Sequence, residues 1–534
     1  MPRVRCALSL TVLLAGCSTC DTAPAAVTDS VQGGFDRGRE VLADGTERAR
    51  EGQDALGRVA DRVLEPGVDL PPESATPPPP ARDGNRARLL INGEASYLER
   101  LRLIDQAQHS IRIQALIFKA DAVGTAIADR LIARKRENPD LDIRVIVDAY
   151  ANLQDYDAQM LYFELMNAGI RVVGYEPLFL EWVNEINLDD WTAGNKRYHE
   201  KYFVIDDRRA VVGGMNIGDE YARCGATPEL IWRDQDIYLE GPVVEDIARA
   251  FDENFDRFVR IRGQRPAVLE SDIYWDAWRN VHPNLRSAVT ASIGRERPWR
   301  SSAPRALDLR GMRARQVRTT AVTDARVQFI RNRPRVHEHW IDEAYRARID
   351  AAQRRVVIAN AYFIPTPELL RALVSAARRG VEVTVLTNSK DTNDIPLIND
   401  AGRVSYRELM RAGVRVYEWH GERHGEGTLH AKLGTFDDEV AIIGSYNLDP
   451  RSYGLNSEDV VVVESPAIAR VLTERVLETD LRFADRITDR EAEEWSNPAL
   501  VPHVTELPDI PFWDPRFDED RFEMFLIEQA SRNL

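Results

Sequence analysis

The chain carries one polar pattern twice, with a fixed separation of 231 residues from His199 to His430. The stretches YHEKYFVIDD (198–207) and LHAKLGTFDD (429–438) each place a histidine two positions before a lysine and end on two aspartates. The same separation relates the asparagines that follow the two stretches. A repeated pattern of this kind indicates that one domain is duplicated, and two such copies normally pack about a pseudo-two-fold axis. The two histidines can then face each other across that axis.

Segments with helical and strand periodicity alternate in the same order before each copy. Apolar residues at helical spacing predict helices at 97–110, 124–138 and 158–169, and again at 340–355, 367–380 and 406–413. Short β-rich runs predict strands at 111–118, 142–149 and 170–176, and again at 356–364, 381–389 and 414–419. Each copy is followed by a strand (235–241; 458–464) and a long helix (242–259; 465–484). The alternation predicts two tandem α/β domains.

The geometry of a β-strand explains the spacing of each histidine and lysine. Side chains at positions i and i+2 point to the same face, so each histidine projects beside its lysine. Asp206 and Asp437 have the opposite parity and suit a hairpin turn, so we interpret them as structural. The return strands end in Gly-Gly and Gly-Ser, where small residues let a ligand approach the backbone. The side chains expected to converge are His199, Lys201, Asn216, His430, Lys432 and Asn447.

This set of groups suits a phosphate. Two imidazoles, two ammonium groups and two amides around one cavity make a cation-rich site for a tetrahedral anion. One imidazole can attack phosphorus while the other protonates the departing oxygen. A lone histidine on a strand is more often structural, but the match in both copies favours catalysis. We expect no metal and no other cofactor, because the protein supplies the positive charge.

The pattern HxKxxxxD, followed by six residues and G-G/S-x-N in both copies, resembles the phospholipase D superfamily over about residues 88–486. The resemblance implies two α/β halves, each a mixed sheet between helices, with the active site at their interface. It implies phosphatidyl transfer through a phosphohistidine, with His199 as nucleophile and His430 as general acid. It also implies an acidic partner from the opposite half, Glu458 for His199 and Asp236 for His430. The catalytic set carried over by the motif is His199, Lys201, Asp206, His430, Lys432 and Asp437, with Asn216, Asn447, Asp236 and Glu458 around the substrate.

Stretches outside the motif are similar to the bacterial cardiolipin synthases within that superfamily. They are GGMNIGDEY, WRDQDIYLEGPVV, ANAYFIP, LTNSKDTNDIPLI and GSYNLDPRSYGLNSE. The similarity implies transfer of a phosphatidyl group to the glycerol hydroxyl of phosphatidylglycerol. The expected partners are phospholipids, phosphatidylglycerol and also phosphatidylethanolamine. The alternatives are a phospholipase D that hydrolyses phospholipids to phosphatidic acid, and a non-catalytic lipid-binding lipoprotein.

The first twenty residues are typical of an export signal, with two arginines before a short apolar run. The tetrapeptide Leu14-Ala15-Gly16-Cys17 resembles the bacterial lipoprotein processing site, which implies lipidation of Cys17; the alternative is an ordinary cleaved signal peptide. Because Ser18 follows the cysteine, the resemblance implies the outer membrane of the bacterial envelope, facing the periplasm. No later segment has eighteen consecutive apolar residues, so we expect a lipid-anchored body without a spanning helix. The anchor and the net charge of −16 disfavour a nuclease, and no nucleic-acid partner is expected.

These patterns divide the chain into six parts. The Pro-rich stretch before residue 88 predicts an extended spacer. The arginines and tryptophans of the linker suit either anionic lipid headgroups or an exposed connection in water. We interpret the Gly-rich segment around His420 and His424 as a loop and not as a metal-binding helix. The parts are a signal peptide (1–16), a lipidated cysteine and tether (17–87), a first domain (88–262), a basic and aromatic linker (263–320), a second domain (321–490) and a tail (491–534).

Overall fold

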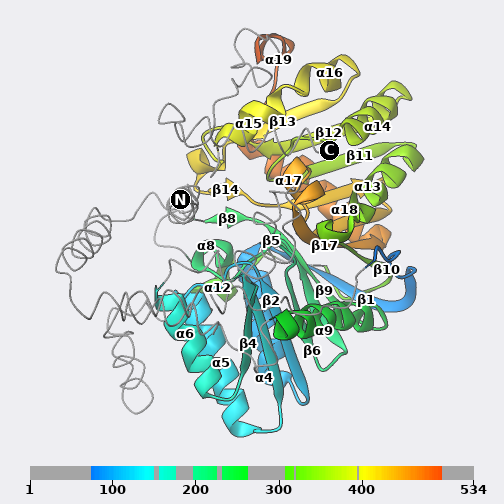
Figure 1. Cartoon of the computed structure of the whole chain (residues 1–534). Helices are drawn as coiled ribbons and strands as arrows, with labels where there is room; N and C mark the ends of the chain where they lie inside the picture. The colour runs from blue at the N-terminus through cyan, green and yellow to red at the C-terminus, as the bar shows by residue number, and fades with distance from the viewer. Residues whose placement is uncertain are drawn as a thin grey trace, which may run out of the picture.

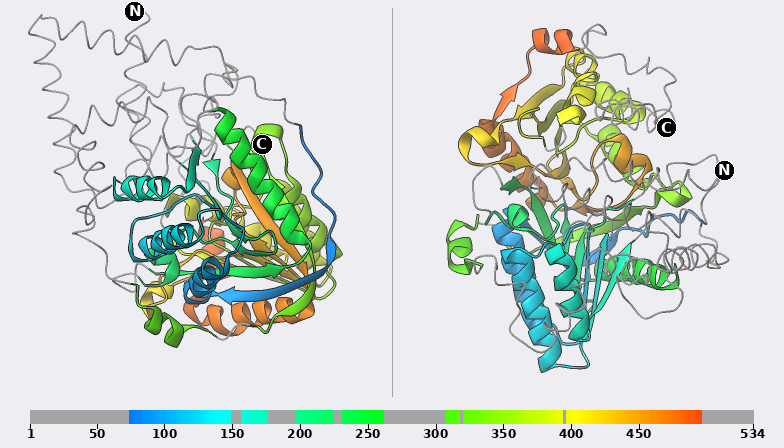
Figure 2. Two further views of the ribbon diagram at one scale, coloured as in Figure 1. Left: turned by 90° about the horizontal axis from the view of Figure 1, so that it is seen from below. Right: turned by 60° about the vertical axis from the view of Figure 1, so that its left-hand side comes forward.

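The computed structural model describes residues 74–148, 156–175, 197–224, 231–261, 307–317, 320–393 and 396–495. The export signal, Cys17 and most of the tether, the linker and the C-terminal tail lie outside these residues. Within the described part, the predicted fold class is confirmed: a large mixed sheet is flanked by helices in two halves (Figure 1). The first half lies below the second half in Figure 1, and the right view of Figure 2 shows the same division from another direction.

The first half forms one arm of the sheet, in the strand order β1-β9-β7-β6-β2-β3-β4. Strands β2, β3 and β4 are parallel to one another, and the other pairs in this arm are antiparallel. Its strands are β1 (Arg82–Ile91), β2 (Ser110–Ala115), β3 (Asp142–Asp148), β4 (Arg171–Tyr175), β6 (Tyr202–Ile205), β7 (Arg209–Gly213) and β9 (Gln235–Glu240).

The second half repeats this order as β10-β17-β16-β15-β11-β12-β13, with β18 added at the edge. The two arms join where β1 pairs antiparallel with β10, so the order of strands reads the same outward from this pair in both directions. This symmetry is the pseudo-two-fold relation that the repeated sequence predicts. The strands are β10 (Thr323–Asn332), β11 (Arg355–Asn360), β12 (Glu382–Asn388), β13 (Arg415–Trp419), β15 (Lys432–Phe436), β16 (Val440–Gly444), β17 (Asn456–Glu464) and β18 (Ala484–Arg486).

Helices cover both faces of each arm. One hydrophobic core runs across both halves and includes Phe251 of α9, Leu472 of α18 and the β1 and β10 residues Leu89 and Val327, whereas each half has a separate core on its other face. The helices of the first half are α4 (Asn92–Gln106), α5 (Ala122–Glu137), α6 (Tyr156–Asn167), α8 (Asp219–Ala222), α9 (Val243–Ile261) and α12 (Leu309–Arg315). Those of the second are η5 (Pro334–Val336), α13 (Trp340–Ala351), α14 (Pro367–Arg378), α15 (Pro396–Arg403), α16 (Tyr406–Arg411), η6 (Gly421–His424), α17 (Pro450–Gly454), α18 (Pro466–Glu474), η7 (Arg475–Thr479), η8 (Asp480–Phe483) and α19 (Asp489–Trp495).

The structure corrects three of the expected boundaries. Strand β1 begins at Arg82, inside the Pro-rich tether, because the chain pairs with both β9 and β10 there. Helix α12 lies within the expected linker and packs on α4, with Met312 buried in the core of the first half. The long helix predicted at 465–484 is wrong beyond Glu474. There the chain winds into the π-helical turn η7 and the 3₁₀ turn η8, whose Asp480 binds arginines from two elements.

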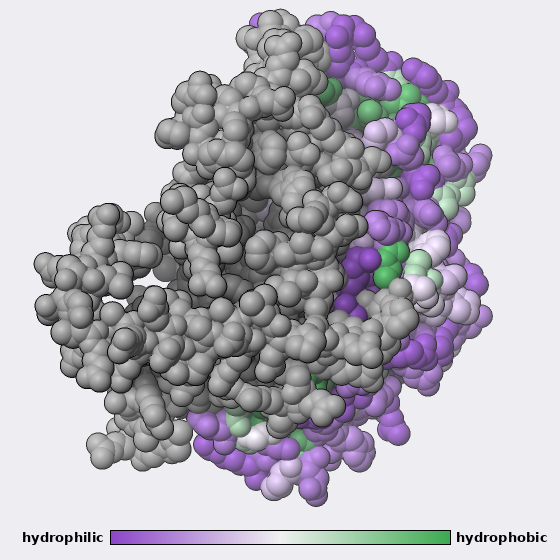
Figure 3. Space-filling model, viewed as in Figure 1, coloured by the Kyte–Doolittle hydropathy of each residue, from purple (hydrophilic) through white to green (hydrophobic). Residues whose placement is uncertain are grey.

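The surface of the described part is mainly polar. The described residues that Figure 3 shows, along the right and lower edges of the view, are mostly hydrophilic with scattered apolar ones. Val404 is the single large apolar residue that is strongly exposed among the described residues. Over the same residues, the structure contains no helix whose length and hydrophobicity would let it cross a bilayer.

Candidate active site

Each histidine follows a two-residue strand that pairs in parallel with a strand across the two halves, and this pairing places the histidine against the opposite half. Strand β5 (Arg197–Tyr198) pairs with the start of β17, and the His199 N–H donates to the Ser457 carbonyl at 2.8 Å. Strand β14 (Thr428–Leu429) pairs with β8 (Trp232–Arg233), and the His430 N–H donates to the Arg233 carbonyl at 2.8 Å. Each histidine therefore lies against the segment that supplies the other half's carboxylate.

Glu458 is the partner of His199, as expected. Nδ1 of His199 lies 2.8 Å from Oε2 of Glu458, and this carboxylate is fully buried. Ser445 and Ser452 donate to its two oxygens at 2.5 and 2.8 Å, and the Asn456 amide donates at 3.2 Å. Burial alone would raise the pKa of Glu458, but the charges of His199 and Lys201 and the donated hydrogen bonds outweigh it and hold the pKa below its usual value. Glu458 is thus an ionised acceptor that keeps the proton of His199 on Nδ1 and its Nε2 free.

The partner of His430 is Asp234, and the expectation that Asp236 has this role is wrong. Nδ1 of His430 lies 2.7 Å from Oδ2 of Asp234, whereas Asp236 is bound by Arg100 at 2.6 Å and by the hydroxyl of Ser96. Asp236 belongs to β9, where it pairs with Gly213 and faces the interior of the first half. Asp234 lies between β8 and β9, at the point where the chain passes from the second half back to the first.

The environment of Asp234 differs from that of Glu458. Burial raises the pKa of Asp234 to about 7; the charge of Lys432 opposes this rise, and the nearby Asp236 adds to it. Besides the contact with His430, the Asp234 side chain accepts the backbone N–H of Gln235 at 2.8 Å. The two histidine partners therefore have pKa values on opposite sides of their ordinary range.

The lysines and histidines of the two halves share one electrostatic environment. Nζ of Lys201 donates to the His199 carbonyl at 2.6 Å, and Nζ of Lys432 donates to the His430 carbonyl at 2.7 Å. Burial lowers the pKa of His199 to about 4, and the charges of both lysines contribute although Glu458 opposes them. Burial also lowers the pKa of His430, and again the lysines of both halves contribute. The predicted convergence of the four groups is thus present, and each ring retains about a tenth of its surface exposed for a substrate.

Asp206 and Asp437 lie at the far ends of the hairpins and take no part in this pocket. The Asp206 carboxylate accepts the backbone N–H groups of residues 108–110 at 2.7–3.0 Å, and Asp437 accepts those of residues 353–355 at 2.7–2.9 Å. Both begin a turn in the left-handed region, with φ of 55° and 54°. Their inclusion in the catalytic set is therefore corrected: they fix each hairpin to the start of the neighbouring strand, as their parity indicates.

The two asparagines are not equivalent. The side chain of Asn216 donates to the Tyr221 hydroxyl at 2.7 Å and accepts the Ile117 N–H at 3.2 Å, so its amide is already used within the first half. The Oδ1 atom of Asn447 is buried without a hydrogen-bond partner. Of the two amides expected at the substrate, that of Asn447 is the one with unused hydrogen-bonding capacity.

Two aromatic rings that the sequence reasoning missed hold His430. Trp232 stacks on its imidazole with a centroid distance of 4.7 Å, and Tyr221 meets it edge-on at 5.2 Å. Trp232 precedes Asp234 by two positions, inside a stretch whose acidic residues alone drew attention in the sequence. Aligning β9 with β17 by their terminal glutamates, Glu240 and Glu464, would have placed Asp234 opposite Glu458 and pointed to this segment.

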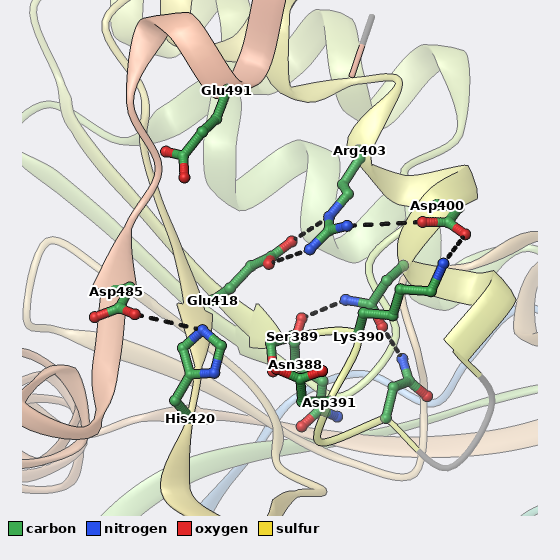
Figure 4. Close-up of polar contacts among 12 residues, drawn as sticks. Asn388, Ser389, Lys390, Asp391, Asp400, Arg403, Glu418, His420, Asp485 and Glu491 are labelled. Carbon is green, nitrogen blue, oxygen red and sulfur yellow. Dashed lines mark hydrogen bonds and ion pairs between the residues drawn. The ribbon is translucent and has the colours of Figure 1, made fainter. Parts of the chain in front are cut away.

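A third missed residue, Asn388, fixes the segment before His430. It lies at the carboxyl end of β12, where ligand sites of parallel sheets commonly form. Its amide donates to the Leu429 carbonyl at 2.7 Å and accepts the Leu429 N–H at 3.0 Å, so it continues the sheet with side-chain atoms. Figure 4 shows Asn388 beside Ser389 and below Lys390.

A buried ion pair locks the two halves together near the pocket. The Arg233 guanidinium donates to Asp480 from two nitrogens at 2.7 and 3.2 Å, and both side chains are fully buried. Asp480 lies in η8, so the irregular end of the α18 segment places this carboxylate against the first half.

A cluster of possible metal ligands occurs at the surface of the second half. Atoms of Asp391, His420 and Glu422 lie within 4.8 Å of one another, and Figure 4 shows His420 facing Asp485. The Arg423 guanidinium approaches Asp485, Glu422 and Asp391 at 3.2–3.7 Å, so a fixed cation already balances these carboxylates. We assign no metal to this cluster.

The sequence matches the family model described as cardiolipin synthase, PLD-like domain, at residues 101–258 and 345–479. Cardiolipin synthase B of Salmonella typhimurium is 30% identical over 396 residues, covering 74% of this chain and 80% of that protein. Cardiolipin synthase 1 of Bacillus cereus is 28% identical over 413 residues, covering 76% of this chain and 69% of that protein. Among solved structures, a phosphatidylserine synthase of Haemophilus influenzae shares the fold, with a TM-score of 0.54 and 15% identity over 84% of this chain and 94% of that one.

Proposed function

Because the chain belongs to the family of cardiolipin synthase, PLD-like domains, as an enzyme of the phosphatidyltransferase kind in the phospholipase D superfamily, we propose that it joins two phosphatidylglycerol molecules into cardiolipin. The observation that carries this proposal is the pair of cross-half histidine–carboxylate contacts, His199 with Glu458 and His430 with Asp234, beside two buried lysines. A pocket with this content offers a nucleophile, an acid and fixed positive charge to a phosphodiester.

The first step forms a phosphohistidine. Nε2 of His199 attacks phosphorus, the bond from phosphorus to the departing oxygen breaks, and His430 gives that oxygen a proton. In the second step the glycerol hydroxyl of another phosphatidylglycerol attacks phosphorus, His430 takes up its proton, and the bond from phosphorus to nitrogen breaks. Glycerol and cardiolipin are the products, and the total charge is unchanged.

The different carboxylates support this division of work. Ionised Glu458 keeps the His199 proton on Nδ1, so that Nε2 presents its lone pair. Burial lowers the pKa of His430, so its imidazole alone would lose its proton. Because the pKa of Asp234 is raised to about 7, the pair of His430 and Asp234 can retain one proton between them. His199, with an ionised partner, then suits the role of nucleophile, and His430, with a partner that holds a proton, suits the role of acid.

The test is product analysis by lipid mass spectrometry. Purified protein is incubated with phosphatidylglycerol vesicles, with and without phosphatidylethanolamine, and we expect cardiolipin and free glycerol. The His199→Ala variant should form neither, while His109→Ala, a change at an exposed histidine of the same half, should match the wild type. Phosphatidic acid without cardiolipin would identify a hydrolase, and no lipid turnover at all would favour a binding protein.

We also propose the localisation that the N-terminal sequence indicates: Cys17 carries a lipid, and the enzyme is anchored in the bacterial envelope facing the periplasm. The support is the lipoprotein-like tetrapeptide that ends at this cysteine. Mass spectrometry of the N-terminal peptide from cells, compared with a Cys17→Ser variant, tests this directly. An unmodified thiol in the mature protein would refute it.

A further inference from the structure

A second pair of carboxyl groups lies directly behind the histidine–lysine segment of the first half. Glu200 is between His199 and Lys201 in sequence, so its side chain points away from the pocket, and Asp459 follows Glu458 in the same way. Both side chains are fully buried. The backbone N–H of Lys201 donates to Oδ1 of Asp459 at 2.9 Å, which fixes Asp459 against this segment.

Each carboxyl group has one oxygen with a partner and one without. Oε2 of Glu200 accepts the Tyr202 hydroxyl at 3.0 Å and the Asn254 amide at 2.9 Å, but its Oε1 is buried without a hydrogen bond. Oδ2 of Asp459 is likewise buried and unpartnered. Among the described residues, no basic side chain forms an ion pair with either group. Arg331, the cross-strand partner of Asp459 in the pairing of β10 with β17, is directed instead at Glu253 and the Ala250 carbonyl.

The second half lacks this pair. The position equivalent to Glu200 is Ala431, and the position equivalent to Asp459 is Gln235. The same strand arrangement therefore forms without the two acids, so the fold of a half does not require them. A feature present in only one of two equivalent halves is a candidate for a role in the unequal chemistry of the two histidines.

We propose that Glu200 and Asp459 share one proton and act as positioning residues that set the charge on Lys201, and through it the affinity of the pocket for the substrate phosphodiester. This inference rests on the proposed function only for the identity of that substrate. Two adjacent buried carboxyl groups that form no ion pair with a cation resist ionising together, and a retained proton gives their unpartnered oxygens a donor. The negative charge of the pair then resides on whichever group holds no proton.

The two carboxyl groups affect Lys201 differently. Burial raises the pKa of Glu200 to about 7, while burial and the charge of Glu200 raise that of Asp459 well above its ordinary value. Burial lowers the pKa of Lys201 to about 7; Glu458 and Asp459 oppose this effect, and Lys432 adds to it. Glu200 is not among the charges with the largest effect on Lys201, whereas Asp459 is. The charged and titratable groups that face the pair are Arg331, Arg333, Tyr202, Lys201 and Glu458.

The two isosteric amide substitutions should therefore shift the titration of Lys201 in opposite directions. In Glu200→Gln, Asp459 is relieved of its neighbour and ionises beside Lys201, which stays protonated to higher pH. In Asp459→Asn, the remaining charge lies on Glu200, which is not among the groups with the largest effect on Lys201, and Lys201 loses its proton at lower pH. The readout is the alkaline limb of kcat/KM for bis(p-nitrophenyl) phosphate, whose own charge is constant and whose leaving group needs no general acid. We expect shifts of about 0.5–1 pH unit upward for Glu200→Gln and downward for Asp459→Asn.

A merely structural role would impair both variants alike and move neither limb. Shifts in the same direction, or no shift, would overturn the proposal. Glu240→Gln, at a half-exposed acid at the far end of β9, should leave the limb in place.

A second measurement separates this inference from the proposed function. If the protein does not turn over the ester, that result counts against the proposed enzyme and not against the shared proton. The pH dependence of the thermal midpoint of unfolding can still be measured in that case. A carboxyl group with a raised pKa stabilises the fold below its unfolded pKa and loses that stabilisation as the pH rises through the folded value. The wild type should therefore lose stability relative to Glu200→Gln between about pH 4.5 and pH 7. Parallel curves for the two proteins would show that no proton is shared.

Discussion

Asp234 and Asp236 are two positions apart, but Asp234 contacts His430 whereas Asp236 forms a buried ion pair with Arg100. Replacing each aspartate by asparagine should therefore affect activity in one case and stability in the other. Asp234→Asn removes the carboxyl group that shares a proton with Nδ1 of His430 at 2.7 Å. A buried hydrogen bond to a charged group contributes about 1.5–3 kcal/mol, which corresponds to a roughly 10- to 150-fold loss of kcat/KM. Because burial raises the pKa of Asp234 to about 7, ionising it is already costly, and we expect the free energy of unfolding to change by only about 1 kcal/mol or less.

Asp236→Asn should give the reverse result. Its carboxylate is the ion-pair partner of Arg100 at 2.6 Å, and both side chains are almost fully buried. Removing one member of a buried ion pair leaves an uncompensated charge and costs about 3–5 kcal/mol of stability. Asp236 makes no contact with either catalytic histidine, so the protein that remains folded should keep nearly its full turnover.

The assay combines kcat/KM for cardiolipin formation, per folded enzyme, with thermal and urea unfolding of the same preparations. Asp83→Asn, at a carboxylate with 87% of its side chain exposed, controls for the loss of a negative charge. If Asp236→Asn loses turnover while keeping its stability, and Asp234→Asn stays active, the assignment of Asp234 as the partner of His430 is wrong.

Three further outcomes follow from the same contacts. Because burial lowers the pKa of His199 from 6.5 to about 4, protons bind preferentially to the unfolded chain, and the contribution of this histidine to stability is complete above pH 6.5 and falls by about 3 kcal/mol toward pH 4. Since Asp234 and Glu200 act in the opposite direction in this range, the measurement is the difference in urea unfolding between the wild type and His199→Ala, and parallel profiles for the two proteins would contradict the shift. Arg233→Met leaves the buried Asp480 with Arg475 as its remaining ion-pair partner among the described residues and should lower the unfolding free energy by about 1–3 kcal/mol, whereas Asp480→Leu takes the carboxylate from both arginines and should cost about 3–5 kcal/mol; an Arg233→Met protein as stable as the wild type would argue against the ion pair. Asn388→Ala removes both side-chain hydrogen bonds to Leu429 and should reduce kcat/KM about tenfold or more with a smaller change in KM, whereas unchanged kcat would mean that this amide does not position the catalytic segment.

Much of the fold could be derived from periodicity and repetition. The alternating helices and strands, the duplicated order and the same-face placement of each histidine and lysine depend on the local geometry of single elements, which a sequence displays directly. The hairpin role of Asp206 and Asp437 followed from parity for the same reason. The end of the α18 segment could not be read in this way, because its irregular turns serve a contact between Asp480 and a residue 247 positions away.

The sequence by itself determined that two copies of one α/β unit each place a histidine and a lysine on the same strand face, and it predicted that the two pairs meet in one pocket. Only the tertiary structure decided that Asp234 and not Asp236 meets His430, that Asn447 and not Asn216 keeps a free amide oxygen, and that Glu200 and Asp459 lie buried behind Lys201. The physical reason is that these contacts depend on β5, β8 and β14, which are two residues long and pair across the halves. A strand that short has no periodicity from which its register could be read, so its partner is set by the packing of the complete sheet.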